Sequence, residues 1–535
     1  MDNMNYVFLE GGTGVRVGLA VCHLADCKAY ASKGKAEGWN MVYETMDAGA
    51  EEIGEILKLL SDNEQLDFCD PSINFAFLKM AERVKKKLQE EGDFCLEKVA
   101  PEWFKNELLL TKEELQRDLL GGYYRDLVIG SIASALAMDC AMETQEDKKA
   151  GFQAIVDAVV ASNNRYEVRV AFAGSGIGGE GRTNLCMHPA MLKKLCIESV
   201  IKELHMQYND AETYVEKNLK IAVIMLGGAF RFPAIEGLNQ DVAGLVAGTL
   251  RNYPKDSADA VNLFYLLEHD CMPVQAEFPS DSGLQFKHAH AIELVAVAMI
   301  ENFFNRTTEE VEKRCPVIPH YSLPGNSRTN WENLGLPDSY RMAMSARLRF
   351  DAALFYWVRP QLILSSKERN AGKIYDSEIL SKMFGGKTGK RLESAIADIG
   401  FDVDSKMITP LSVLLDKETR WLSYLRDVCL TGKNWETGAM PAESFGTSLF
   451  PVDQIDKLLE HTHIRYVGGM TGYKLDALTD CPESNRYHTG MTLDRIRSQI
   501  TYTNHGTPRD FKEIMGGLYE MCSKVKEKKY GIFGK

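Results

Sequence analysis

The sequence has no hydrophobic run that approaches the roughly 18 apolar residues of a membrane span. Its first residues, MDNMNYVFLEGG, also lack the long apolar segment of a secretory signal peptide, because Tyr6 to Leu9 is followed almost at once by glycines. We therefore expect a cytoplasmic protein that makes no contact with a membrane.

Cysteines and histidines at metal-binding spacing are also missing. The twelve cysteines include no CxxC pair, and the eleven histidines form no HExxH motif. Zinc ribbons, redox motifs and zinc proteases need such spacing. In a reducing compartment the cysteines are therefore expected to be small buried apolar residues.

A surplus of positive charge is absent as well, since the formal net charge is −13. Proteins that bind nucleic acids generally need a basic face that displaces the counterions of the phosphate backbone. The charge of this chain therefore argues against nucleic acid as a partner.

What the sequence does have is the composition of a large globular protein, with 45% hydrophobic and 26% charged residues. A length of 535 residues predicts two or three domains, at about 100–200 residues per domain. We place an α/β domain at 1–305, with a charged helical insertion at 51–116 and a buried apolar helix at 288–304. A linker is predicted at 306–330, and a mainly helical α+β domain at 331–535.

Short apolar runs that end in glycines recur in the first half of the chain. Asn5 to Glu10 leads into Gly11-Gly12-Thr13-Gly14, and Glu167 to Phe172 leads into Gly174 to Gly181. An apolar helical pattern follows each of these two loops. Strands that alternate with helices in this way predict an α/β fold with a largely parallel sheet.

Such glycine loops are typical of phosphate-binding sites. Glycine lets the backbone approach a phosphate, and the next helix offers free N–H groups and the positive end of its dipole. Because the carboxyl ends of parallel strands share one edge, the loops at 11–14 and 174–181 can converge on one ligand. Further glycine pairs stand at Gly121-Gly122 and Gly227-Gly228. The alternative, that a glycine pair only makes a tight turn, is expected for one or two of the four.

Two other segments of the sequence approach known nucleotide-binding motifs. Gly174-x-Gly176-x-x-Gly179 fits a dinucleotide fingerprint, but the next strand ends without the carboxylate that would hold the ribose. The first loop has Asp47 after its next strand, but its glycine spacing differs, so a nicotinamide cofactor remains an alternative. Ser381 to Thr388 is a near-match to a P-loop that lacks the first glycine and the preceding strand, and we reject it.

The order of these motifs resembles the tubulin/FtsZ superfamily, particularly the divergent bacterial tubulin-like proteins. The first glycine loop, the aspartate loop around Asp47, and Gly121-Gly122 ahead of a helix follow the family order. The loop at 176–181 resembles the GGGTGSG signature, and the apolar helix at 288–304 resembles the central helix of the family. The resemblance covers roughly residues 1–360.

This resemblance implies a guanine nucleotide, GTP or GDP, with Mg²⁺ near Asp47 and Glu180. Glu180 stands where the signature has threonine, which implies either a cation close to this loop or a degenerate site. For the base, Asn262 is the best-placed candidate. The predicted nucleotide contacts are Gly11, Gly12, Thr13, Gly14, Arg16, Asp47, Ala48, Gly121, Gly122, Arg125, Gly176, Gly178, Gly179, Glu180, Gly181, Gly228 and Asn262.

Three functional hypotheses follow. The first is a tubulin-like nucleotide-binding protein, a Mg²⁺-dependent GTPase that assembles into homo-oligomers or filaments under nucleotide control. The second is a catalytically inactive scaffold whose C-terminal domain binds protein partners. The third, with the least support, is an NAD(P)-binding oxidoreductase of the Rossmann type.

Overall fold

The computed structural model describes most of the N-terminal three-fifths of the chain and little beyond it. The described residues are 3–26, 39–46, 73–88, 95–99, 111–119, 127–227, 242–269, 291–312 and 320–323, with 336, 339, 340 and 343. The predicted C-terminal domain at 331–535 therefore lies almost entirely outside the described residues, and the expectation that it is helical stays a prediction.

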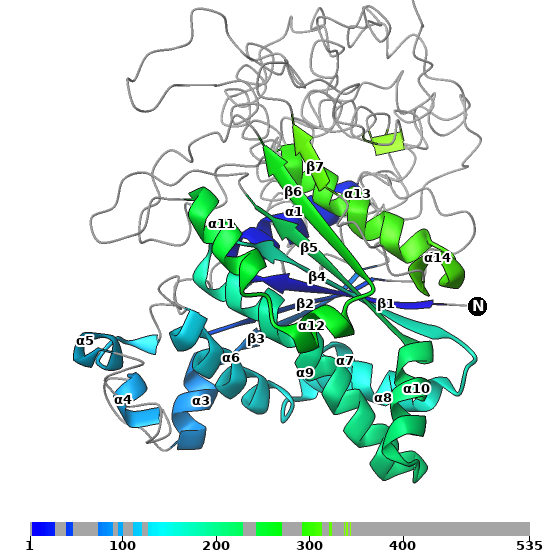
Figure 1. Cartoon of the computed structure of the whole chain (residues 1–535), viewed down its shortest axis with the longest axis horizontal. Helices are drawn as coiled ribbons and strands as arrows, with labels where there is room; N and C mark the ends of the chain where they lie inside the picture. The colour runs from blue at the N-terminus through cyan, green and yellow to red at the C-terminus, as the bar shows by residue number, and fades with distance from the viewer. Residues whose placement is uncertain are drawn as a thin grey trace, which may run out of the picture.

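The described part of the chain is built around one parallel sheet of seven strands in the order β3-β2-β1-β4-β5-β6-β7 (Figure 1). The strands are β1 (Asn3–Glu10), β2 (Trp39–Thr45), β3 (Ile73–Lys79), β4 (Glu167–Ser175), β5 (Leu219–Leu226), β6 (Leu263–His269) and β7 (His320–Leu323). Every residue of β4 and β5 is buried, as expected for central strands that are covered on both faces.

One face of the sheet carries the larger group of helices. These are α6 (Leu127–Ala141), α7 (Gln145–Ala150), α8 (Phe152–Ser162), α9 (Gly179–Leu204), α10 (Tyr208–Asn218), α11 (Val242–Arg251) and α12 (Lys255–Ala260). Under them, the rings of Phe8 and Phe152 lie 4.8 Å apart edge to face, and Phe8 lies 5.2 Å from Phe172. These aromatic residues form the centre of the main core.

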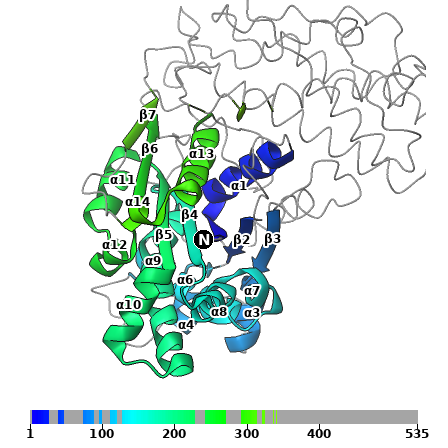
Figure 2. The same cartoon turned by 90° about the vertical axis from the view of Figure 1, so that its right-hand side faces the viewer.

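The opposite face carries α1 (Gly11–Asp26) and α13 (Ala291–Asn305), which pack against each other (Figure 2). The guanidinium of Arg169 fixes the end of α13, since its Nη1 donates to the carbonyls of Phe303, Phe304 and Arg306 at 2.9, 3.1 and 2.7 Å. These bonds satisfy carbonyl groups that a helix leaves open at its carboxyl end.

Five short elements complete the described chain: α3 (Ala81–Leu88), α4 (Leu96–Val99), α5 (Lys112–Leu115) and α14 (Thr308–Glu312), with the edge strand β7.

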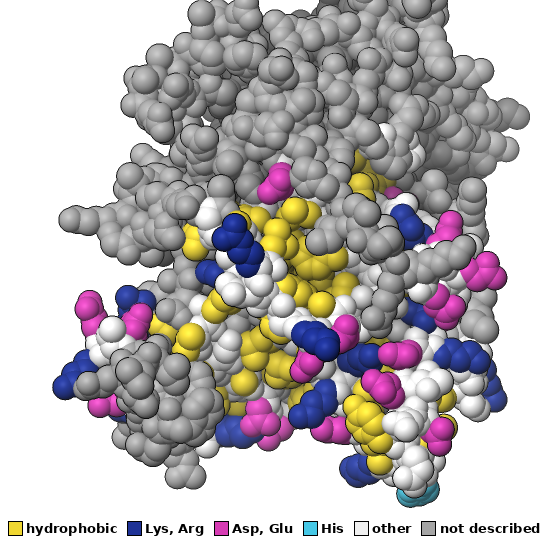
Figure 3. All heavy atoms as spheres, in the orientation of Figure 1, with side chains coloured by type: hydrophobic (Ala, Val, Ile, Leu, Met, Phe, Trp, Pro, Cys, Tyr) yellow, Lys and Arg dark blue, Asp and Glu magenta, His cyan; other side chains and the backbone are white. Residues whose placement is uncertain are grey.

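On the face seen in Figure 3, apolar side chains gather near the centre, while Lys and Arg are interspersed with Asp and Glu around them. No described helix is long and apolar enough to cross a bilayer.

The predicted α/β fold with a parallel sheet is confirmed, but two details of the domain prediction are wrong. The interval 51–116 is not purely helical, because β3 lies inside it and pairs in parallel with β2. The interval 306–330 is not only a linker, because α14 and β7 lie in it and β7 pairs with β6. In both cases a short segment of the chain gains its strand conformation by pairing with a neighbouring strand.

Candidate functional site

The strand order reverses between β1 and β4. Strands β2 and β3 lie on one side of β1, and strands β4 to β7 follow in order on its other side. In open α/β sheets, ligands bind outside the carboxyl ends of the strands at such a reversal point. The β1–α1 and β4–α9 connections, which contain the two predicted glycine loops, both lie at this edge.

The two connections touch each other. Gly11 has a φ of +66°, in the left-handed region, and a Cβ built on it would lie 2.8 Å from the backbone nitrogen of Gly181. A Cβ on Gly181 would in turn lie 2.8 Å from the carbonyl oxygen of Glu10. Glycine at both positions therefore permits a backbone approach that any larger residue would obstruct. Two predicted site segments, far apart in sequence, meet here.

Two predicted contact residues take part in the packing at this edge. A Cβ on Gly14 would lie 2.5 Å from the carbonyl oxygen of Ala173, so Gly14 faces the sheet. The Gly176 N–H donates to the carbonyl of Leu226 at 2.9 Å, and its own carbonyl accepts from the Thr249 hydroxyl at 3.1 Å. Gly14 and Gly176 therefore have a packing role at this edge of the sheet, and their contact with a ligand stays a prediction.

Other residues of the two loops remain accessible. Gly12, Thr13, Gly178, Gly179 and Glu180 are half-buried. A Cβ on Gly178 would meet nothing within 4 Å, and this residue is the N-cap of α9 without a side-chain capping bond. The 16-residue α1 and the 26-residue α9 thus both begin at this edge. Helix N-termini with uncapped N–H groups are ready-made anion sites.

Behind the loops lies a buried group of hydrogen-bonded side chains that the sequence did not predict. His188 Nδ1 lies 2.7 Å from Glu10 Oε1, and the Asn184 amide donates to Glu10 Oε2 at 2.8 Å. On its other side, His188 Nε2 lies 3.0 Å from the Ser134 hydroxyl. This resembles a nucleophile–base–acid arrangement, but Ser134, His188 and Glu10 are only 1, 1 and 2% exposed. These hydrogen bonds therefore hold Glu10, which directly precedes Gly11, in a fixed position.

A second carboxyl, that of Glu44, lies beside Glu10 and was also missed. Both residues directly follow the paired residues Leu9 and Tyr43 of the adjacent strands β1 and β2. Burial raises the pKa of Glu44 well above its usual range, and the charges of Asp147, Glu10 and Glu180 raise it further. The hydroxyl of Thr45 donates to Glu180 Oε2 at 3.3 Å, which connects β2 to the start of α9.

Arg16, predicted to contact the nucleotide, forms a buried ion pair instead. Its Nη2 lies 2.6 Å from Oε1 of Glu293 in the first turn of α13, and both side chains are at most 5% exposed. Desolvation lowers the pKa of Arg16, while the charge of Glu293 opposes that shift. The pair ties α1 to α13 and so supports the first loop from behind.

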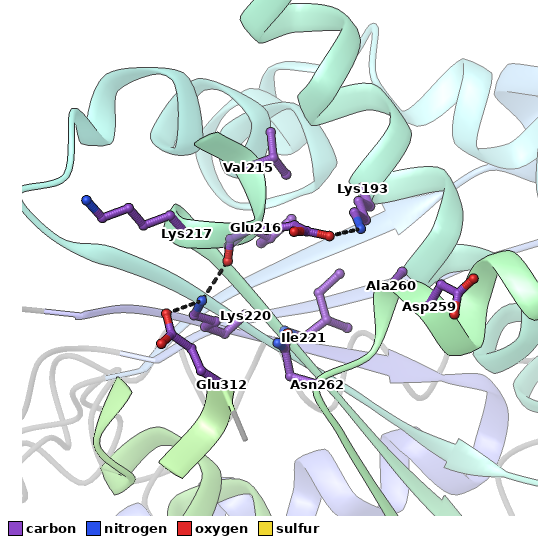
Figure 4. A pocket seen from close by; sticks show the side chains of 11 residues that line it. Lys193, Val215, Glu216, Lys217, Lys220, Ile221, Asp259, Ala260, Asn262 and Glu312 are labelled. Carbon is purple, nitrogen blue, oxygen red and sulfur yellow. Dashed lines mark hydrogen bonds and ion pairs between the residues drawn. The ribbon is translucent and has the colours of Figure 1, made fainter. Parts of the chain in front are cut away.

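Asn262 does not join the other predicted residues, so its assignment to the base is a correction. It precedes β6, where its side-chain oxygen accepts from the Ile221 N–H at 2.8 Å. The second glycine loop lies beside Leu226 at the carboxyl end of β5, because the Gly176 N–H donates to the Leu226 carbonyl. Leu226 is about 16 Å farther along the sheet than Ile221 at 3.3 Å per residue. Asn262 instead lines a pocket of about 260 Å³ at the amino edge, which includes the ion pairs Lys193–Glu216 and Lys220–Glu312 (Figure 4).

The remaining predicted residues lie outside the described part of the chain. They are Asp47, Ala48, Gly121, Gly122, Arg125 and Gly228. Among the residues that are described, no group of three or more His, Cys, Asp or Glu side chains is arranged to hold a metal ion. A metal contact from Asp47 therefore stays a prediction.

Comparison with known proteins gives no further assignment, since no family model, curated protein or solved structure was found to match the chain. The class is defined by the fold and the site alone. The described residues form a parallel α/β domain of the Rossmann-like kind, with two glycine connections in contact at its reversal point.

Proposed function

We propose that this protein binds a nucleotide through its phosphates at the edge where the β1–α1 and β4–α9 connections meet. The observation that carries the proposal is the contact between Gly11 and Gly181, because it brings the N-termini of two helices to one place. The accessible backbone at Gly12, Gly178 and Gly179 would provide N–H groups for phosphate oxygens.

Within this class, we propose a tubulin-like protein that binds GTP with Mg²⁺ and assembles with further copies of itself. The order of the sequence motifs supports this assignment. The packing of α13 against α1 supports it as well, because it gives the long apolar helix the central place that the resemblance implies. Asp47 and the Gly121-Gly122 pair belong to the proposed site as predictions from the sequence.

One observation favours a second candidate, a nucleotide-binding scaffold without turnover. Glu180 lies in the first turn of α9, where it would repel a phosphate unless a cation neutralises it. Measuring phosphate release from GTP by the full chain separates the two candidates. Turnover supports the GTPase, and stable binding without turnover supports the scaffold.

The binding experiment itself is a titration of the full-length protein with GTP, ATP and NAD(H), each with and without Mg²⁺. We expect GTP to bind tightest. A preference for NAD(H) would support the oxidoreductase, for which the strand order is equally suitable. If none of the three binds, the proposal is wrong.

Gly178→Leu should weaken phosphate binding while leaving the fold intact. Gly178 has φ −69° and ψ 154°, which is ordinary extended backbone, and its added side chain would enter open space. The loss of glycine at the N-cap should cost only about 1 kcal/mol of stability. We expect the affinity for GTP to fall at least about tenfold, which corresponds to about 1.4 kcal/mol.

The matched control for Gly178→Leu is Glu198→Gln, an exposed change farther along the same helix. It should bind GTP like the unmodified protein, and thermal melting should show both variants to be folded. Full affinity in a folded Gly178→Leu variant would remove the start of α9 from the site.

Asn262→Asp should leave the choice of base unchanged. Aspartate keeps an oxygen that can accept from the Ile221 N–H but loses the amide group that would read a base. Because Asn262 lies at the amino edge of the sheet, the ratio of the GTP and ATP affinities should be the same as in the unmodified protein. A changed ratio in equilibrium titrations would restore Asn262 to the nucleotide site.

A further inference from the structure

The pocket at the amino edge of the sheet, which Asn262 lines, has no part in the proposed function. Its volume of about 260 Å³ is slightly below the roughly 300–1,000 Å³ of pockets for drug-sized ligands, so its size suits a small metabolite. Side chains from α9, α10, β5, α12 and α14 line it together with Asn262 (Figure 4). A hollow on which polar groups from several elements converge is typical of small-molecule binding.

Lys220 brings a buried ammonium group to this pocket. The residue is 1% exposed, and its Nζ donates to the backbone carbonyl of Glu216 at 2.6 Å. Its one carboxylate partner among the described residues is Glu312, whose Oε1 lies 3.3 Å away and whose side chain is 51% exposed. Hydrogen bonds between charged groups are usually about 2.7–2.9 Å long, so this contact is weak. An ammonium also has a third N–H, so Lys220 can bind a closer anion.

Asn262 adds a second donor beside Lys220. Its backbone N–H donates to the carbonyl of Ile221 at 2.8 Å, and its side-chain oxygen accepts from the Ile221 N–H, also at 2.8 Å. These two bonds fix the side chain against the residue that follows Lys220. The amide Nδ2 of Asn262 donates to no residue in the described part of the chain. Two fixed donors in one pocket, one of them charged, match the two oxygens of a carboxylate.

The lining of the pocket carries charges of both signs, which argues against a ligand that is only an anion. The three basic and three acidic side chains are Lys193, Lys217 and Lys220 with Glu216, Asp259 and Glu312. A polyphosphate would face all three carboxylates, whereas a ligand with one positive and one negative group complements both signs. Glu216 is bonded to Lys193 at 2.9 Å, but an ionised carboxylate has about four acceptor sites. It can therefore accept an ammonium group as well.

We propose that this pocket binds a small zwitterion, an amino acid with an aliphatic side chain. The carboxylate of the ligand binds Nζ of Lys220 and Nδ2 of Asn262, and its ammonium group binds the carboxylate of Glu216. Its aliphatic side chain contacts Val215 and Ile221, which belong to the same lining. The site is separate from the proposed nucleotide site, because it lies at the opposite edge of the sheet.

Isothermal titration calorimetry of the full chain with L-valine and L-leucine tests the proposal. Two fragments of valine are titrated in parallel: isovalerate, which lacks the ammonium group, and isobutylamine, which lacks the carboxylate. We expect both amino acids to bind. Each fragment should bind at least about tenfold more weakly than valine, because it loses the hydrogen bonds of one charged group.

Two variants remove one donor each. Lys220→Met replaces the ammonium group by an apolar side chain of similar length, and Asn262→Asp keeps an oxygen for the Ile221 N–H but loses the amide donor. Each should weaken valine binding at least about tenfold. Lys194→Met, the same substitution at an exposed residue of α9 outside the pocket, should leave valine binding unchanged. Thermal melting shows which variants are folded, and Asn262→Asp carries the test if Lys220→Met does not fold.

Three results would overturn the proposal. The first is a lack of binding of both valine and leucine at millimolar concentrations. The second is unchanged valine affinity in the folded Asn262→Asp variant, because the carboxylate would then not lie at this amide. The third is isovalerate that binds as tightly as valine, which is the behaviour of a general anion site and not of a site for an amino acid.

Discussion

Gly11→Ala should destabilise the N-terminal domain by about 2–5 kcal/mol. Two costs add up at this position. A side chain in the left-handed region at φ +66° is strained, and the new Cβ would lie 2.8 Å from the backbone nitrogen of Gly181. Because the obstacle is backbone and not a flexible side chain, the β1–α1 and β4–α9 connections would have to move apart. Urea denaturation followed by circular dichroism measures the loss.

The control for Gly11→Ala is Gly248→Ala, in α11. There the nearest atom to the added Cβ is Nη2 of Arg182 at 3.8 Å, an ordinary contact. Alanine inside a helix should stabilise it by about 0.5–1 kcal/mol. If Gly11→Ala were as stable as the unmodified protein, the contact between the two glycine connections would not exist in solution.

His188→Ala should have a comparable effect, a loss of about 3–5 kcal/mol. His188 Nδ1 lies 2.7 Å from Oε1 of Glu10, in a site where both side chains are at most 3% exposed. The substitution leaves a buried carboxylate with only the bond from Asn184. It also leaves a cavity beside Phe152, whose ring lies 5.2 Å from the imidazole. Chemical denaturation is again the measurement.

Two further variants identify the source of the loss at His188. Ser134→Ala removes only the outer hydrogen bond and should cost about 1 kcal/mol. Adding Glu10→Gln to His188→Ala removes the charge from Glu10, so the double variant should regain part of the lost stability. An unchanged loss in the double variant would assign the effect to the cavity and not to the carboxylate.

The strands predicted from the sequence, Asn5 to Glu10 and Glu167 to Phe172, are short apolar runs that lead into glycines, and they form most of β1 and β4. The segment of β5, Leu219–Leu226, is apolar apart from Lys220, which fits a strand buried in the middle of the sheet. Ile73–Lys79 was missed because its short apolar run lies in charged sequence, and only the pairing with β2 makes it a strand. The helix at 291–305 was predicted because its own residues are mostly apolar on every face. Glu293 is an exception, since it is buried as the partner of Arg16.

Part of the candidate site could also be predicted from local patterns in the sequence. Glycines that follow strands are visible in a sequence, so the two loops that meet at Gly11 and Gly181 were identified. Some of these glycines, such as Gly14, pack against the backbone of a strand. That contact depends on distances in the folded structure, so it could not be predicted from the sequence. The Glu10–His188 pair and the position of Glu44 arise from residues far apart in the chain, and no local pattern marks them.

The central claim is that both glycine connections bind one phosphorylated ligand, and hydrogen–deuterium exchange tests it most directly. Amide exchange is measured for the full chain with and without GTP and Mg²⁺. We predict that peptides covering 11–14 and 178–181 become protected together, at the same GTP concentration, while peptides around Asn262 do not change. Protection of only one of the two loops, or protection confined to the amino edge of the sheet, would contradict the account.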